Sequence, residues 1–148
     1  MIAIGSDHGG YKLKEEIKKY LDEKEIKYID FGTNSEERTD YPIYAKKVAT
    51  AITKGECDKG ILFCRSGQGM AIVANKFKGI RAADVNNEEA ARFGKADDDI
   101  NVLTLGGDYL TVNQAVCIIR TWLATEFKQG RYQERIQMIE EIEKENMK

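Results

Sequence analysis

The chain has 148 residues, with 23 lysines and arginines, 25 aspartates and glutamates and one histidine, which gives a formal net charge of −2. This length fits a single domain over residues 1–148 and is enough to bury a stable core without a disulfide or a metal. A hydrophobic content of 42% and a charged content of 32% exclude disordered and collagen-like chains, and the nearly neutral charge gives no reason to expect nucleic acid as a partner.

Two further features of the composition bear on location. The sequence has no apolar run of about 18 residues, so we expect no membrane span, and Met1–Gly5 lacks the features of a signal peptide. The three cysteines are odd in number and widely separated, which fits reduced thiols better than a disulfide framework. We therefore expect a cytoplasmic protein.

Short apolar runs alternate with helical patterns along the whole chain. The predicted strands are Met1–Gly5, Ile26–Phe31, Gly60–Phe63, Ile80–Val85 and Asn101–Leu105. The first predicted helix begins after Gly10, and the second opens at Asp40–Pro42. The other predicted helices span Met70–Lys76, Glu88–Lys95, Thr111–Phe127 and Arg131–Lys144. Continuous apolar strands separated by amphipathic helices predict an α/β fold, with a five-stranded parallel sheet and one extra helix at the C-terminus.

Ligands of such sheets bind beyond the carboxyl ends of the strands. This rule selects three loops, Ser6–Gly10, Cys64–Gly69 and Gly106–Asp108. In the second loop, two glycines and a following helix N-terminus suit a phosphate or an oxyanion. The same position predicts a lowered pKa for the Cys64 thiol. The alternative is a buried cysteine at a strand end beside a tight turn.

Other polar residues are candidates with equally plausible structural roles. Asp7 and His8 follow the first strand, although a lone histidine is more often a hydrogen-bonded structural group. Arg131 and Arg135 are four residues apart on one helix face, where they could grip a phosphate or simply be solvated. Tyr41 could reach the crevice or pack against its neighbours.

Several motifs in order along the chain together resemble the ribose-5-phosphate isomerase B and galactose-6-phosphate isomerase family. They are Ser6-Asp7-His8-Gly9-Gly10, Asp30-Phe31-Gly32-Thr33, Asp40-Tyr41-Pro42, Ala74-Asn75-Lys76 with Gly79-Ile80-Arg81-Ala82-Ala83, Asn101-Val102-Leu103, and Gly130-Arg131 with Arg135. The resemblance implies a Rossmann-like three-layer αβα sandwich and an aldose–ketose isomerase of sugar phosphates that uses neither a metal nor a nucleotide cofactor. It also implies at least a dimer, with active sites between subunits.

The resemblance also assigns roles to individual residues. Cys64 matches the base that moves a proton between C1 and C2, and Met70 stands where other members carry a glutamate base, so the cysteine type is indicated. The amides of Ser66–Gly69 would hold the enediolate oxygen. Asp7 and His8 match positions that contact sugar and phosphate, and Arg131 and Arg135 match arginines that hold the phosphate.

Four positions depart from the family pattern. Arg65 replaces a glycine, Asp97 replaces the histidine that opens the sugar ring, Asp98 replaces an asparagine that helps to bind substrate, and Asp108 replaces an arginine. We expect Arg65 either to neutralise a cluster of Asp97 and Asp108 or to take over part of the phosphate grip. The predicted catalytic residues are Cys64, Ser66 and Asp97, and the predicted substrate-binding residues are Asp7, His8, Tyr41, Arg65, Gly67, Gln68, Gly69, Asp98, Asp108, Arg131 and Arg135.

These observations leave three functions open. The first is an isomerase of ribose 5-phosphate and ribulose 5-phosphate, or of a related sugar phosphate such as a four-carbon one, which needs no ring opening. The second is a non-catalytic sugar-phosphate-binding subunit, because galactose-6-phosphate isomerase is built from two related chains. The third, a thiol redox protein, is the least favoured because no second cysteine follows Cys64 closely. The expected assembly is a homodimer, a homotetramer, or a hetero-oligomer with a related chain.

Overall fold

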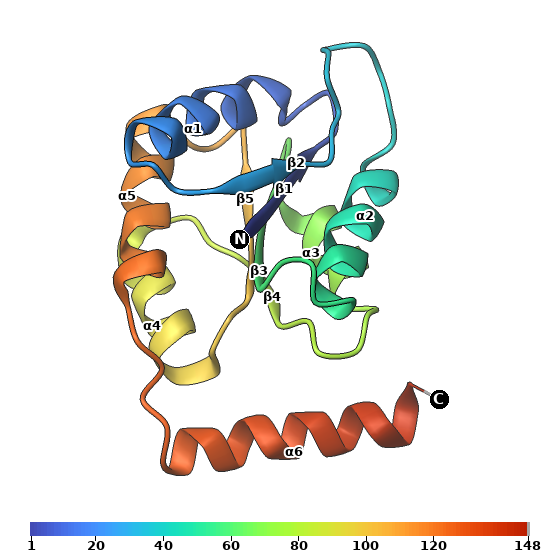
Figure 1. Ribbon diagram of the computed structural model, residues 1–148, viewed down its shortest axis with the longest axis vertical. Coiled ribbons are helices and arrows are strands. Elements are labelled where there is room, and N and C mark those ends of the chain that lie inside the picture. Colours follow the sequence, from blue (N-terminus) through green and yellow to red (C-terminus); the bar gives the residue numbers. More distant parts are fainter. Residues whose placement is uncertain (148) are drawn as a thin grey trace.

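A computed structural model describes residues 1–147, and its five strands form one parallel sheet in the order β2-β1-β3-β5-β4 (Figure 1). The strands are β1 (Ile2–Ser6), β2 (Tyr28–Asp30), β3 (Lys59–Cys64), β4 (Ala82–Asp84) and β5 (Val102–Gly106). The helices are α1 (Tyr11–Glu23), α2 (Tyr41–Thr53), α3 (Gln68–Ala74), α4 (Glu88–Asp98), α5 (Val112–Ala124) and α6 (Arg131–Asn146). The predicted α/β fold with a parallel sheet is confirmed.

The helices cover both faces of the sheet. Because successive side chains of a strand point to opposite faces, Ile61 and Phe63 of β3 pack with α1, α4 and α5, whereas Leu62 and Cys64 pack with α2 and α3. The result is a three-layer αβα sandwich, as predicted (Figure 1). Cys64 therefore lies in the layer between the sheet and α3.

Side-chain caps mark the starts of α4 and α5, and several predicted boundaries shift in the structure. Asn87 caps α4 by accepting a hydrogen bond from the Ala90 amide at 2.7 Å, and the helix continues to Asp98, so Asp97 and Asp98 are helical rather than part of a loop. Thr111 is not helical but forms a capping box with Gln114 ahead of α5. The predicted strand Ile80–Val85 is shortened to the three residues of β4.

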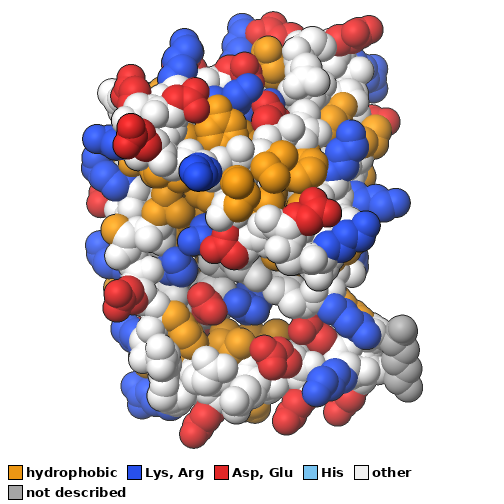
Figure 2. Space-filling view, in the orientation of Figure 1, with side chains coloured by type: hydrophobic (Ala, Val, Ile, Leu, Met, Phe, Trp, Pro, Cys, Tyr) orange, Lys and Arg blue, Asp and Glu red, His pale blue; other side chains and the backbone are white. Residues whose placement is uncertain are grey.

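Helix α6 lies apart from the sandwich and crosses its amino-terminal side (Figure 1). Ile136 is its one buried residue among those described, and Glu143 accepts a hydrogen bond from the Gly79 amide at 2.8 Å. A hollow with apolar side chains along it separates α6 from the rest of the chain in the space-filling view (Figure 2). Within residues 1–147, no helix has the length and apolar character needed to cross a membrane.

A buried ion pair ties α1 to the edge strand β2. Lys14 is fully buried, and its Nζ lies 2.7 and 2.8 Å from the two carboxylate oxygens of Asp30. Lys18 adds a second contact to Asp30 at 3.0 Å. Burial opposes ionisation of Asp30, but its hydrogen bonds from Lys14, Gly32 and Lys18 together hold the pKa of this carboxyl below its usual range.

Replacing Asp30 with asparagine should leave the Lys14 ammonium buried without its main counter-ion. We expect D30N to lower the free energy of unfolding by about 3 kcal/mol, measured by urea denaturation. The matched control is E16Q, which removes the exposed Glu16–Lys19 pair at 3.0 Å and should cost less than about 1 kcal/mol. Equal effects of the two variants would contradict the role assigned to the buried pair.

Candidate active site

The three loops chosen from the sequence meet at the carboxyl edge of the sheet. Strand register pairs Cys64 with Gly106, and the Gly107 amide donates to the Cys64 carbonyl at 2.8 Å. The Asp108 amide donates to the Arg65 carbonyl at 3.0 Å, and the Asp7 amide donates to the Phe63 carbonyl at 3.3 Å. Backbone hydrogen bonds thus hold all three loops in one place.

Cys64 stands at the centre of this edge, with its side chain almost fully buried. The Gly67 amide donates to Cys64 Sγ at 3.0 Å. Gly67 has φ +81°, and a Cβ at this position would overlap the Asp84 carboxylate, so the turn requires glycine. The loop therefore aims backbone amides inward, at the thiol.

The predicted lowering of the Cys64 pKa is wrong. Burial raises the pKa of the thiol, and it outweighs the opposing hydrogen bonds from the amides of Gly67, Met70 and Ser66. The negative charge of Asp7 raises it further. The helix-start position correctly indicated amide donors, but no local pattern indicates how deeply the sulfur is buried.

The first loop contributes two fixed polar side chains. Asp7 is buried, and its Oδ1 accepts a hydrogen bond from the Gly10 amide at 3.1 Å. His8 Nδ1 lies 3.0 Å from the Thr39 carbonyl oxygen and 3.2 Å from the Thr39 nitrogen. This contact fixes the ring and leaves Nε2 on the opposite side for another partner.

The remaining predicted residues of this edge occupy its rim. Ser66 Oγ accepts a hydrogen bond from the Gln68 amide at 3.2 Å, and the Gln68 side chain is exposed. Tyr41 packs its ring against Gly69, where a Cβ would lie 2.6 Å from the ring. Tyr41 therefore takes at least the packing role that was one of its two alternatives.

Arg65 forms an ion pair with Asp108, with 3.6 Å between Nη1 and Oδ1. Both side chains are largely exposed, so the pair itself contributes little to stability. They line a crevice of about 340 Å³ together with His8, Lys12 and Glu36. Arg65 thus neutralises Asp108 at the crevice wall, which is one of the two roles expected for it.

The other predicted residues lie at the opposite edge of the sheet. Asp97 precedes β5 and Asp108 follows it, and the five residues of this strand separate them by roughly 16 Å. The expected cluster of Asp97 and Asp108 is therefore wrong for a single chain. Asp98 is exposed at the same amino edge, where Arg131 also begins α6.

Three cations surround Tyr132 at this amino edge, and one of them, Lys128, is absent from the predicted list. The cations of Lys128, Arg131 and Arg135 lie 4.9, 5.5 and 5.4 Å from the centre of its ring. Lys128 Nζ lies 2.9 Å from Asp97 Oδ1. Lys128 lies in the non-helical segment before α6, so no helical spacing in the sequence could have placed it beside the two arginines.

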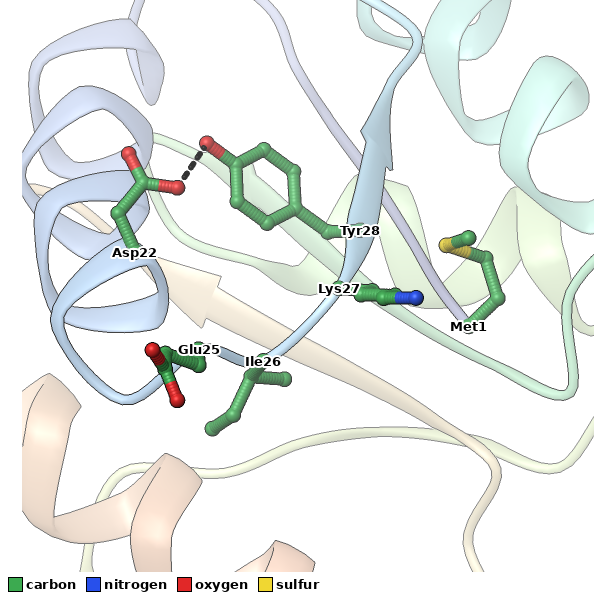
Figure 3. A pocket seen from close by; sticks show the side chains of 6 residues that line it. All are labelled: Met1, Asp22, Glu25, Ile26, Lys27 and Tyr28. Carbon is green, nitrogen blue, oxygen red and sulfur yellow. Dashed lines mark hydrogen bonds between the residues drawn. The ribbon is translucent and has the colours of Figure 1, made fainter.

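A large hollow of about 840 Å³ lies apart from the residues of the predicted site. It is lined by Met1, Asp22, Glu25, Ile26, Lys27 and Tyr28, beside the edge strand β2 (Figure 3). Tyr28 donates its hydroxyl to Asp22 at 2.9 Å across this hollow. It contains no residue of the predicted site.

The comparison with known families decides the relationship. The profile described as Ribose/Galactose Isomerase matches residues 2–139. The chain belongs to this family. Among its relatives, ribose-5-phosphate isomerase B of Escherichia coli K12 is 44% identical, with 96% of this chain and 95% of that protein covered.

Solved structures of the same family have the same fold. The ribose-5-phosphate isomerase B of Clostridium thermocellum is 47% identical and has a TM-score of 0.95, with 97% of each chain covered. The enzyme of Mycoplasma genitalium, solved with bound ribulose-5-phosphate, is 38% identical and has a TM-score of 0.93, with 98% of this chain and 97% of that chain covered.

Because its pKa is raised, the Cys64 thiol should ionise at a higher pH than an ordinary cysteine. Its thiolate should still be forming above about pH 8.5, where an unperturbed cysteine is half ionised. The measurement is the thiolate ultraviolet absorbance of the intact chain minus that of C64S, which cancels Cys57, Cys117 and the tyrosines. A titration complete below pH 8 would show that the loop amides prevail over burial.

Proposed function

We propose that this chain is an aldose–ketose isomerase that interconverts ribose 5-phosphate and ribulose 5-phosphate, with Cys64 as the base. The observation that carries the proposal is the position of the Cys64 thiol. It accepts hydrogen bonds from the backbone amides of the loop that follows it, and it lies beside a crevice lined by His8 and Arg65. The relatives named ribose-5-phosphate isomerase B support the choice of substrate.

In this proposal the Cys64 thiolate removes the proton from C2 of the open-chain aldose. The electron pair moves toward the carbonyl oxygen and forms an enediolate. The same proton, or one exchanged with water, then returns to C1, while the proton of the C2 hydroxyl passes to the C1 oxygen as the ketone forms. Amides of Ser66–Gly69 stabilise the enediolate oxygen when they turn from the sulfur toward the substrate. A neutral resting thiol requires deprotonation before or during substrate binding.

The proposed site needs a second copy of the chain. Arg131 and Arg135 lie beside Asp97 and Lys128 at the amino edge, whereas Cys64 lies at the carboxyl edge. A five-carbon sugar phosphate cannot bridge these two edges of one sheet. We propose that α6 of a partner supplies the arginines to the crevice beside Cys64 in a homodimer. A homotetramer, a mixed assembly with a related chain and a cytoplasmic location stay predictions.

A four-carbon aldose phosphate is the second candidate substrate. The observation that favours it is Asp97, which is paired with Lys128 where the resemblance implies a ring-opening histidine. A substrate too short to close a ring needs no such group. Activity with four-carbon aldose phosphates and none with ribose 5-phosphate would select this alternative.

Replacing Cys64 with alanine should abolish exchange of the C2 proton of ribose 5-phosphate with deuterated water, followed by NMR. We expect a loss of about 10²–10⁴-fold, the usual worth of a positioned general base. The matched control is C57A, which truncates another buried cysteine packed on the same side of the sheet and should retain activity. Near-normal exchange in C64A would exclude Cys64 as the base, and failure of the unaltered chain to convert ribose 5-phosphate to ribulose 5-phosphate would exclude the proposed substrate.

A site shared between subunits predicts complementation between two inactive variants. C64A and the double variant R131A/R135A should each be inactive alone. After mixing and subunit exchange they should recover about a quarter of the full activity, because half of the dimers are mixed and each of these has one intact site. A chain that sediments as an active monomer, or mixed dimers without any recovered activity, would contradict the shared site.

A further inference from the structure

A second charged pocket lies at the amino edge of the sheet, outside the candidate active site. It has a volume of about 240 Å³, and its charged lining residues are Asp58, Lys59, Arg81, Lys95 and Asp99. The indole of Trp122 forms part of its wall. Three cations therefore face two carboxylates in a small concave site.

The ion pairs within the pocket leave the Lys95 ammonium without a carboxylate partner among the described residues. Arg81 is bound to Asp99, with 3.1 Å between Nη2 and Oδ2 and a further hydrogen bond of 2.9 Å to the Asp99 carbonyl. Lys59 lies 3.7 Å from Asp58. Across residues 1–147, no carboxylate comes within 4 Å of the Lys95 ammonium. Its one hydrogen bond there is to the Trp122 carbonyl at 3.3 Å.

The position of Lys95 makes its missing counter-ion significant. The side chain is half-buried, and its ammonium lies 5.6 Å from the centre of the Trp122 ring. Burial lowers the pKa of Lys95, and the nearby charge of Lys59 lowers it further. An ammonium has three donors, of which the Trp122 carbonyl occupies one. A bound anion would satisfy the others and relieve the repulsion between the two lysines.

We propose that this pocket binds a small oxyanion, a phosphate or a carboxylate, held by Lys95 with Lys59 at its side. The pocket is distinct from the arginines of the candidate active site. Asp97, two residues beyond Lys95, lies about half a turn around α4 and contacts Lys128 instead. The inference does not depend on the proposed isomerase activity, because it rests only on the charges and contacts of this pocket.

The chain contains a built-in reporter for this pocket. Trp122 is its only tryptophan, and its indole Nε1 is held by a 2.9 Å hydrogen bond to the Ile100 carbonyl. We therefore propose titration of the full chain with inorganic phosphate at constant ionic strength, adjusted with chloride, while tryptophan fluorescence is recorded. The expected result is a saturable change in emission. A repeat with malonate distinguishes phosphate from carboxylate binding.

Three variants test the assignment. K95M keeps the aliphatic stem but removes the charge, and it should weaken the apparent affinity at least tenfold. K19M makes the same change at an exposed lysine paired with Glu16 and should leave the titration unchanged. R131A/R135A removes the arginines of the candidate active site and should also retain the response.

Two results would overturn the proposal. One is a response that is linear in phosphate, or identical in K95M and the unaltered chain. The other is a response lost in R131A/R135A but kept in K95M, which would assign it to the candidate active site. K59M provides an independent variant of the same pocket, expected to weaken binding severalfold, so that a folding defect in K95M would not remove the test.

Discussion

The parallel direction of β1, β3 and β5 is the constraint on which the rest of the molecule depends. Because all three strands run the same way, the loops after Ser6, Cys64 and Gly106 must meet at one edge of the sheet. The same rule sends every residue that precedes a strand to the far edge. Asp97 and the start of α6 are therefore separated from Cys64 by the length of a strand, and the proposal of a site shared between two copies rests on this separation.

Two ion pairs neutralise the aspartates at two positions where the resemblance implies other residues. Asp108 is paired with Arg65 at the carboxyl edge, and Asp97 is paired with Lys128 at the amino edge. Each aspartate thus has a cation supplied by a neighbouring loop, so neither presents an uncompensated negative charge to a phosphate. The two aspartates are neutralised by different cations, because the two edges of the sheet are too far apart for Arg65 to pair with both.

Sequence reasoning anticipated the features that local chemistry decides. Alternating apolar runs predicted the sheet, the start of the helix at Glu88 was predicted correctly, and the glycines after Cys64 indicated the amide-lined turn. Features that depend on distant packing were beyond it. The burial of Cys64 under α3 reversed the expected direction of its pKa, and contact between Lys128 and Asp97 joins residues 31 positions apart. The position of a side chain relative to the two edges also requires the completed sheet.

Helix α6 is only sparsely attached to the sandwich, and this affects the order in which the parts of the chain become ordered. The helix has 16 residues, yet Ile136 is its one buried residue in the described chain, whereas Met138, Ile139 and Ile142 are exposed. An isolated helix of this length is only marginally stable in water. Its amide hydrogens should therefore exchange with solvent through local opening, well before those of β3 or β5. Since Arg131 and Arg135 lie on its first turns, the sandwich can be complete while the arginine-bearing segment still fluctuates, and contact with a second copy would be the step that orders it.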